Sequence, residues 1–407
     1  MTVLVEPSRD RVQKELIMHL NPKARVIVRP GAMPRTVSEE IRNHFYTQAN
    51  PIRGLRKVIF PRKAYEREFR RLFGEAVFDY IIDYEGFSSF FATICLMQKN
   101  AKTCIWMHSD MRSEYRTRFH WLERIFALYP QFDYLVSSSG QLMEVNRDNF
   151  SKYVPPEKFK HAKNCVDFAS VHAGSREGKI IRRQDEYYYT LLSESDFLTN
   201  MKLIPLQPGR FDLSEDKNME LCGCTEAVKN GVIRFVTVGR LSVEKNQAQL
   251  VRAFARLAAE QPEIMLFIIG HGPEKEKLKQ LIAQLHMQER IILTGRLSNP
   301  FGLMRQCDCF VRPSLYEGQP LVVFEARALH MPIILSDYAT IEGSVVTKGQ
   351  YIVHKEADSI YEGLRAYLLG KVPDDYVFMD EEYNREAYAE FEQAVFGESR
   401  MLSHIGE

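Results

Sequence analysis

The chain has 407 residues, 45% of them hydrophobic, which is enough for two domains with separate cores. Its formal net charge of +1 at pH 7 says little about partners. The chain opens without a signal peptide, and its longest apolar stretch, residues 87–97, is too short to cross a bilayer, so we expect neither secretion nor a membrane span.

Charge is divided unevenly along the chain. Up to Asn164 there are 27 Lys and Arg against 18 Asp and Glu, a net of +9, and the remainder carries 27 against 35, a net of −8. A basic first half and an acidic second half predict two modules, with an anionic partner for the first.

The seven cysteines are odd in number and irregularly spaced, which predicts reduced thiols and a cytosolic setting. Cys222 and Cys224 are separated by one residue, and so are Cys307 and Cys309. This is not the spacing of the usual zinc ligands, so we favour buried thiols over a metal site.

In the first half, short apolar runs alternate with helical stretches. Strands are predicted to start at positions 2, 25, 57, 78, 102 and 132, and helices are predicted over 9–20, 64–76 and 87–100. Such alternation indicates a parallel sheet covered on both faces. We assign residues 1–165 to an N-terminal Rossmann-like domain, completed by a C-terminal helix at 380–400.

The alternation of strands and helices stops between residues 166 and 230. This stretch is polar, with one plausible strand at 201–207, and we interpret it as an insertion or linker. Alternating strands and amphipathic helices then resume. Residues 231–375 therefore predict a second doubly wound domain, and the whole chain is predicted to be an α/β protein with two Rossmann-like domains.

In the second domain, four successive strands end in small residues followed by polar groups. Ligands bind outside these carboxyl ends in an open parallel sheet, so this edge predicts a site for one polar ligand. The four stretches are 238–246, 268–274, 293–296 and 313–326, and they contain Gly239, Arg240, Lys245, Arg296, Glu317, Gly318 and Glu325.

The helix that begins at Pro320 adds a site for an anion. Proline is favoured at the first helical position, and the free N–H groups of Leu321 and Val322 lie at the positive end of the helix dipole. Arg240 and Lys245 can reach the same place. Together these groups predict a diphosphate site that would also stabilise a departing diphosphate.

Two carboxylates complete the pattern. Glu325 could accept two hydrogen bonds from a ribose diol, and Glu317 would be free in its loop to hold hydroxyls of a transferred sugar. Each residue also has a plainer interpretation: Arg240 as a surface charge, Lys245 as part of a helix start, Glu325 as a partner of Arg327. Their joint placement at consecutive strand ends favours the site.

These stretches resemble the donor half of family-4 glycosyltransferases, of the kind associated with bacterial cell-surface polymer or teichoic-acid-type biosynthesis. Glu317 and Glu325 match that family's E-x₇-E pair. The resemblance implies the GT-B fold, in which two Rossmann-like domains face each other across a cleft. It also implies retaining transfer from a nucleotide-diphosphate sugar without a metal ion or other cofactor, with the leaving phosphate taking the acceptor proton.

The resemblance implies a role for each matched residue. Arg240 and Lys245 would contact the donor diphosphate, and with Glu317, which would hold the donor sugar, they form the implied catalytic set. The implied donor-binding residues are Gly239, Arg296, Gly318, Leu321, Val322 and Glu325, with Glu325 holding the ribose.

The N-terminal domain is expected to hold the acceptor. His108 follows a strand, where the family places a histidine that touches the donor sugar or acceptor; the alternative is a histidine bonded to the backbone. Segment 52–72 carries eight Lys and Arg against two Glu. It could lie on an anionic membrane, grip a phosphate-rich polymer, or be a plain solvated helix. The sequence shows neither an aromatic platform for bases nor a helix suited to reading a DNA groove, so we do not expect nucleic-acid binding.

Three departures from the family pattern qualify the resemblance. The chain opens without the strand and glycine-rich turn usual in the family, so its first strand could be missing and a partner chain could complete the sheet. Cys165 and His330 stand where the family often has glycine, and Cys165 would make a left-handed turn costlier there.

We therefore expect a cytoplasmic transferase, able to work at the inner face of the membrane, that moves a hexose or N-acetylhexosamine from a UDP-sugar. The acceptor would be a glycan or polyol-phosphate polymer of the cell surface, or a lipid-linked acceptor. Two alternatives stay open: a catalytically degenerate subunit or chaperone of an active partner, and a sugar-phosphate epimerase with the same two-domain architecture.

Overall fold

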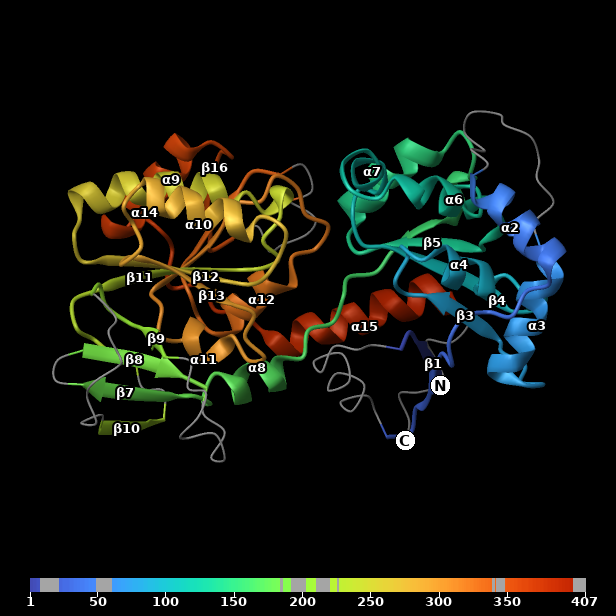
Figure 1. The fold of residues 1–407 in the computed structure, drawn as a ribbon, viewed down its shortest axis with the longest axis horizontal. Helices are drawn as coiled ribbons and strands as arrows, with labels where there is room; N and C mark the ends of the chain where they lie inside the picture. The colour runs from blue at the N-terminus through green and yellow to red at the C-terminus, as the bar shows by residue number, and fades with distance from the viewer. Residues whose placement is uncertain are drawn as a thin grey trace. The chain divides into compact units, whose positions relative to one another are not determined.

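The computed structural model describes residues 1–7, 22–48, 61–183, 186–191, 203–209, 220–224, 227–338, 341 and 348–397. The chain forms two compact units, one of Met1–Lys163 with Glu390–Glu407 and the other of Asn164–Ala389 (Figure 1). The first crossing between them, at Lys163 and Asn164, lies close to the boundary at 165 that the sequence suggests.

The first unit is built on a parallel four-stranded sheet with the order β3-β4-β5-β6. A separate parallel pair, β1 and β2, precedes it. The strands are β1 (Thr2–Val5), β2 (Arg25–Val28), β3 (Tyr80–Asp83), β4 (Lys102–Met107), β5 (Tyr134–Ser137) and β6 (Phe159–His161). The strands predicted near 2, 25, 78, 102 and 132 are confirmed, whereas the helix predicted over 9–20 and most of the strand predicted from 57 lie outside the described residues.

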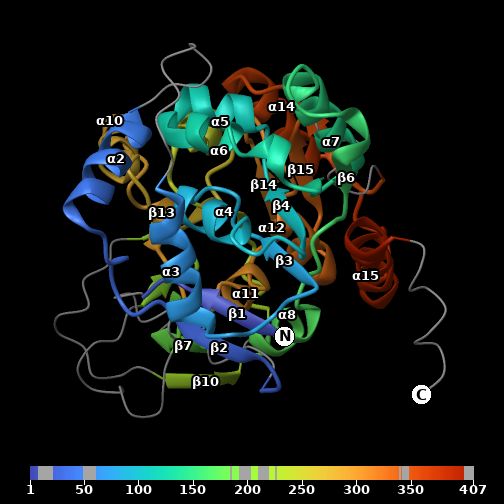
Figure 2. The ribbon, with the colours of Figure 1, turned by 90° about the vertical axis from the view of Figure 1, so that its right-hand side faces the viewer.

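Helices cover both faces of this sheet. They are α2 (Val37–Gln48), α3 (Arg62–Phe73), α4 (Ser89–Cys95), α5 (Met111–Thr117), α6 (Glu123–Phe126), α7 (Gly140–Phe150) and the end of α15 (Asp380–Phe396). Figure 2 shows α7 beside β6. On the opposite face, the indole of Trp106 stacks on Phe391 of α15 with 5.6 Å between ring centroids. Residues 390–396 thus belong to the core of the first unit, in line with the expectation that the C-terminal helix completes it.

The second unit contains a parallel six-stranded sheet with the order β13-β12-β11-β14-β15-β16. Its strands are β11 (Ile233–Val238), β12 (Ile264–Ile269), β13 (Ile291–Gly295), β14 (Cys309–Arg312), β15 (Ile333–Ser336) and β16 (Tyr351–Val353). The strand order reverses between β11 and β14, and in such sheets a crevice for ligands forms outside the strand ends at this point.

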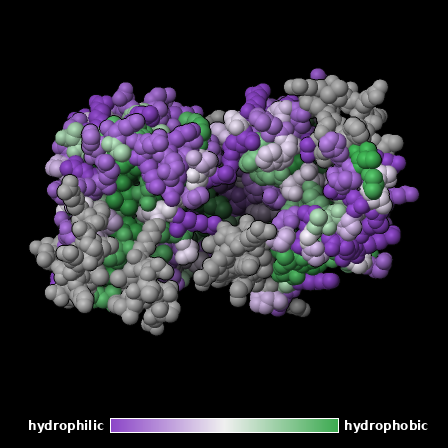
Figure 3. Space-filling view, viewed as in Figure 1, coloured by the Kyte–Doolittle hydropathy of each residue, from purple (hydrophilic) through white to green (hydrophobic). Residues whose placement is uncertain are grey.

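Helices lie on both faces of this sheet (Figure 1). On one face are α9 (Gln247–Glu260), α10 (Lys275–Gln284) and α14 (Ala357–Leu368), and on the other α8 (Phe168–Gly174), α11 (Phe301–Met304) and α12 (Leu321–Ala328). Leu250, Phe254 and Leu257 of α9 are buried against the sheet, as a helix with one apolar stripe requires. Hydrophilic side chains gather on the visible outer surface over α9, α10 and α14 (Figure 3).

The stretch from 166 to 230 is more ordered than the sequence predicted, because it holds an antiparallel sheet with the order β10-β7-β8-β9. The strands are β7 (Lys179–Arg183), β8 (Glu186–Thr190), β9 (Ile204–Pro205) and β10 (Glu220–Cys224). Tyr189 of β8 is fully buried in the core of the second unit. A Cβ at Gly302 would come 2.5 Å from its hydroxyl oxygen, so α11 packs directly on this tyrosine. The sequence predicted only one strand in this stretch, at 201–207, and this was wrong. The other strands form because they pair with segments that are not adjacent in the sequence, which no local pattern reveals.

The basic segment 52–72 is described only from residue 61 onward, where it forms most of α3. Three of its arginines pair with glutamates: Arg62 with Glu66, Arg67 with Glu39 and Arg71 with Glu68. Pairing of this kind is typical of a solvated helix, and contact with a membrane stays a prediction. Within the described part of the chain, no helix is long and apolar enough to span a membrane.

His330, which the sequence singled out, adopts the left-handed conformation that usually calls for glycine. Its φ is 55° and it directly follows α12, where its N–H donates to the carbonyl of Arg327 at 2.8 Å. Cys165 is not among the non-glycine residues with positive φ, so the cost expected there does not arise.

We expect His330→Gly to raise the free energy of unfolding by about 0.5 kcal/mol, because the strain of a left-handed Cβ exceeds the extra unfolded-state entropy of glycine. Urea unfolding of the purified chain measures this. His330→Ala keeps the Cβ and is the control; an equal gain for alanine would show that the imidazole, not the backbone, causes the strain.

Candidate functional site

The loops that follow β11 and β14 meet at the point where the strand order reverses. The loop after β11 also packs closely on the loop after β12: a Cβ on Gly270 would lie 1.9 Å from the carbonyl oxygen of Gly239, and one on Gly272 would lie 2.2 Å from that of Leu241. Only glycine fits Gly270 and Gly272 without moving the main chain. The glycines at the strand ends therefore pack the loops together.

Lys245 reaches the site from a short 3₁₀ helix, η5 (Val243–Lys245). The next residue, Asn246, is left-handed with a φ of 56°, and its side-chain amide donates to the carbonyls of Pro313 at 3.0 Å and Lys355 at 2.8 Å. The N–H of Leu315 donates to the carbonyl of Glu244 at 2.8 Å. These bonds tie the loop after β11 to the loop after β14.

Glu317 is buried at the centre of a cluster of charges. One carboxylate oxygen accepts from the guanidinium of Arg312, at 2.9 Å from Nε and 2.7 Å from Nη2, and from the hydroxyl of Ser314 at 2.6 Å. The other oxygen accepts from Nζ of Lys245 at 2.9 Å. Ser336 adds a hydroxyl that donates to the carbonyl of Ser314.

The expectation that Glu317 is free in its loop is therefore wrong. Burial by itself would raise its pKa, but the attraction of Arg312 and Lys245 and the hydrogen bonds outweigh burial and hold the pKa at about 2. Burial, together with the like charge of Arg312, lowers the pKa of Lys245, and Glu317 opposes that shift. The carboxylate is thus ionised at neutral pH and fixes two cations.

Arg312 and Ser314 were missed in the sequence, although one signal was available. Arg312 ends β14, all of whose residues are buried, and a charge in a buried strand normally has a dedicated partner. Its guanidinium also donates to the carbonyl of Val238 at the end of β11. It joins the two strands that flank the site.

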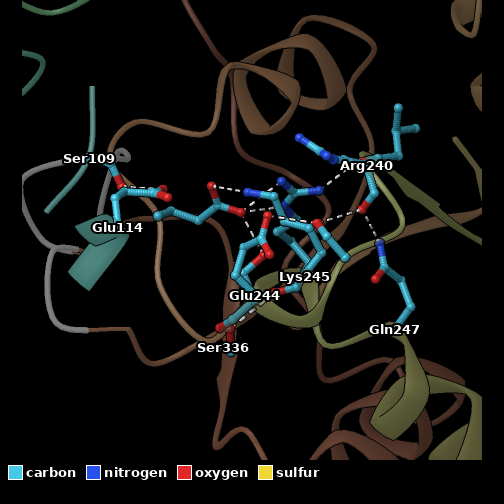
Figure 4. Close-up of polar contacts among 12 residues, drawn as sticks. Ser109, Glu114, Arg240, Glu244, Lys245, Gln247 and Ser336 are labelled. Atoms are coloured by element: carbon cyan, nitrogen blue, oxygen red, sulfur yellow. Dashed lines mark hydrogen bonds and ion pairs between the residues drawn. The ribbon is translucent and has the colours of Figure 1, made fainter. Parts of the chain in front are cut away.

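Arg240, in contrast, is exposed, and its guanidinium forms no hydrogen bond or ion pair with any residue that the structure describes. Only its backbone is fixed, because its carbonyl accepts from the side-chain amide of Gln247 at 2.8 Å (Figure 4). Arg296 is also exposed, at the end of β13. Arg240 is therefore a cation that an anionic ligand could engage without breaking an existing bond.

Glu325 lies in α12 and makes no hydrogen bond or ion pair with the described residues. Burial raises the pKa of its carboxyl to about 7, and Arg312 opposes this shift. The alternative pairing with Arg327 does not occur: Arg327 donates to the carbonyls of Gly349 and Lys348. Glu325 is thus a largely buried carboxyl whose hydrogen-bonding capacity is unused.

Helix α12 begins after Pro320 and has no side-chain cap at its N-terminus. Leu321 and Val322 are half-buried, and Gly318 is buried. The first N–H groups of a helix have no partner within it, so an uncapped start next to Glu317 can receive an anion.

His108 follows β4 of the first unit and is half-buried. Its Nε2 bonds to the carbonyl oxygen of Tyr84, so this nitrogen carries the proton. Burial lowers the pKa of the ring, and that hydrogen bond opposes the shift. The neutral ring leaves Nδ1 as an acceptor, which could receive a hydrogen bond from a hydroxyl.

The cysteines that the structure describes are free thiols, and four of them, Cys95, Cys104, Cys307 and Cys309, are buried. Among the described residues, no group of three or more His, Cys, Asp or Glu side chains is placed to hold a metal ion.

Residues 226–385 match the model of the family "Glycosyl transferases group 1". An uncharacterized glycosyltransferase of Methanocaldococcus jannaschii is 41% identical over 106 residues, 26% of each chain. The N-acetylgalactosamine-N,N'-diacetylbacillosaminyl-diphospho-undecaprenol 4-alpha-N-acetylgalactosaminyltransferase of Campylobacter jejuni is 32% identical over 33% of this chain and 36% of its own. The poly(glycerol-phosphate) alpha-glucosyltransferase of Bacillus subtilis is 29% identical over 38% of this chain and 24% of its own. The chain therefore matches only a quarter to about a third of the length of these relatives.

Solved structures match nearly the whole chain. The Anabaena protein HepE, solved with UDP and glucose, aligns with a TM-score of 0.57 at 15% identity over 96% of this chain and 87% of its own. Sucrose-phosphate synthase of Thermosynechococcus elongatus aligns with a TM-score of 0.56 at 14% identity over 92% of this chain and 79% of its own. The lipopolysaccharide outer core galactosyltransferase WaaB aligns with a TM-score of 0.53 at 16% identity over 97% of this chain and 99% of its own. At such low identity these likenesses concern the fold alone.

We expect Glu317→Gln to destabilise the chain by about 3 kcal/mol at pH 7, because two buried cations lose their counter-charge. Since the folded pKa of Glu317 lies below its ordinary value of 4.5, at about 2, its contribution to stability should be present above pH 4.5 and lost as the pH falls toward 2. Urea unfolding of the wild type and the variant at pH 7 and at steps from about pH 4.5 down toward pH 2 measures both. A loss below 1 kcal/mol would contradict a buried ion pair.

Glu325→Gln should behave in the opposite way. Its folded pKa is raised from 4.5 to about 7, so the stability of the wild type should fall between these values as the pH rises. The glutamine variant avoids this loss and should gain up to roughly 3 kcal/mol relative to the wild type from pH 5 to pH 8. A pH-independent difference in unfolding free energy would show that Glu325 is solvated.

Proposed function

We propose that the chain is a retaining glycosyltransferase that uses a UDP-sugar. The match of residues 226–385 to the model of the glycosyl transferases group 1 family and the GT-B fold support this proposal. The chain would move a hexose or N-acetylhexosamine to a cell-surface polymer or a lipid-linked acceptor. The relatives' acceptors, a poly(glycerol-phosphate) in one case and a diphospho-undecaprenol-linked sugar in another, support this acceptor class.

One observation carries the proposal: a buried cation is fixed just before the uncapped start of α12. Nζ of Lys245 is held at 2.9 Å from Glu317, three residues before Pro320, and the exposed guanidinium of Arg240, in the same loop as Lys245, is unengaged by described residues. Cations and helix N–H groups together neutralise a diphosphate better than either alone. Glu325, with free acceptor capacity, would hold the ribose hydroxyls.

In the proposed reaction, the bond from the anomeric carbon of the sugar to the β-phosphate oxygen breaks. A bond to the acceptor oxygen forms on the same face, and the acceptor proton passes to the departing phosphate. Lys245, Arg240 and the first N–H groups of α12 stabilise the charge that develops on the diphosphate. Glu317 acts by holding Lys245 and Arg312 in place, and no metal ion takes part. His108 would accept a hydrogen bond on the acceptor side through Nδ1.

Binding of nucleoside diphosphates tests the donor site. Thermal shift with UDP, ADP and GDP should show the largest rise in Tm with UDP. Arg240→Ala should weaken UDP binding by about tenfold or more without changing stability, because a charged hydrogen bond to phosphate is worth about 1.5–3 kcal/mol. The exposed Arg305 makes no side-chain bond with described residues, so Arg305→Ala is the matched control.

Products distinguish the alternatives. A transferase should slowly hydrolyse UDP-sugar to UDP and the free α-sugar when no acceptor is present. An epimerase would yield an altered sugar, and a degenerate subunit would bind UDP without turnover. Failure of UDP, ADP and GDP alike to raise the Tm of the wild type would contradict the proposal.

A further inference from the structure

Gln319 lies inside the loop that opens the candidate site, between Glu317 and Pro320. Its amide belongs to a closed ring of three hydrogen bonds. Oε1 accepts the backbone N–H of Asn164 at 2.7 Å, and Nε2 donates to the hydroxyl of Tyr383 at 2.8 Å. That hydroxyl donates to the carbonyl of Asn164 at 2.9 Å. The ring joins the loop to two segments that are distant in the sequence.

These two segments are where the chain passes from one unit to the other. Asn164 is the first residue of the second unit, and α15, which carries Tyr383, contains the return at Ala389 and Glu390. A second pair of bonds joins the same segments. Asn384 accepts from the N–H of Val166 at 3.0 Å and donates to its carbonyl at 2.7 Å.

Tyr383 is held firmly enough to direct its hydroxyl. Its ring centroid lies 4.6 Å from that of Phe324 in α12 and 5.7 Å from that of Phe378. Only 7% of Tyr383 and 9% of Asn164 are exposed. Polar groups buried to this extent must keep their hydrogen bonds, because water cannot replace them.

The ring needs a side chain of the length of glutamine that accepts and donates at once. Glutamate can accept from Asn164 but cannot donate to Tyr383, and leucine can do neither. Glu317 anchors one end of the segment 317–320 to the sheet through Arg312, and Gln319 anchors the other end. Only Gly318 lies between the two anchors, and Pro320 and α12 follow Gln319 directly.

We propose that Gln319 is a positioning residue that holds the start of α12 toward the donor diphosphate and couples donor binding to the segment 164–166. The inference rests on the proposed function. Because coupling is reciprocal, a diphosphate that orders the loop must also strengthen the bond to the N–H of Asn164. The same bond, when lost, must weaken diphosphate binding.

Two measurements on the full chain test this: UDP affinity by calorimetry, and amide hydrogen exchange by mass spectrometry over a peptide that contains residues 164–166. The variants are Gln319→Leu, Tyr383→Phe, both together, and Gln319→Glu. Tyr361→Phe is the matched control, because it removes the hydroxyl of another buried tyrosine of the second unit, bonded to Glu260 at 2.8 Å.

We expect Gln319→Leu and Tyr383→Phe each to weaken UDP binding by about tenfold, and the double variant by less than the product of the two. Gln319→Glu, which keeps one bond, should lie between leucine and the wild type. UDP should slow exchange in 164–166 in the wild type and in Tyr361→Phe, but not in Gln319→Leu. A purely structural role would change stability without this dependence on UDP.

The outcomes separate the inference from the proposed function. If the wild type binds UDP and the Gln319 and Tyr383 variants bind it equally well, the coupling is wrong and the proposed function stands. If UDP slows amide exchange in residues 164–166 equally in every variant, the coupling is also wrong and the proposed function stands. If the wild type binds no UDP, both the coupling and the proposed function are contradicted. Should Gln319→Leu fail to fold, Gln319→Glu and Tyr383→Phe decide the matter.

Discussion

The buried carboxylate of Glu317 is the constraint on which the geometry of the candidate site depends. It brings together Arg312 from the end of β14 and Lys245 from the loop after β11, and neither cation could stay beside the other without it. Burial opposes its ionisation, and the two cations restore it, so the cluster exists only as a whole. The position of Lys245, and with it the charge that faces a ligand, follows from this single carboxylate.

The site divides its charged groups into those already engaged and those left available. Lys245 and Arg312 are engaged, and they give the loop a fixed shape. The guanidinium of Arg240 and the carboxyl of Glu325 make no bond with described residues, and they differ in kind: one is an exposed cation and the other a largely buried carboxyl with a pKa of about 7. A diphosphate and a ribose diol would meet these two requirements without disturbing the fixed cluster. Preorganised charge of this kind lowers the cost of reaching a charged transition state.

Two of the anchors of the loop 313–320 differ in their chemistry. Glu317 uses ion pairs to the sheet, and Gln319 uses neutral hydrogen bonds to Asn164 and Tyr383. Ion pairs fix position strongly but also resist change. Neutral bonds of about 1 kcal/mol each can be strengthened or broken by a ligand. We therefore assign rigidity to the first anchor and coupling to the second.

The sequence by itself determined the parallel sheet of the second unit and the strand ends at which polar residues gather, because apolar runs and the glycines that follow them are local features. It also placed Lys245 and Glu317 together through their positions at strand ends, and the two form an ion pair at 2.9 Å. Only the tertiary structure decided that Glu317 is occupied by Arg312, that the stretch 166–230 holds a second sheet, and that Gln319 bonds to Asn164 and Tyr383. The physical reason is distance along the chain: an ion pair, a strand pairing or a ring of hydrogen bonds between residues far apart in sequence leaves no periodic trace, since it is chosen by packing rather than by local propensity.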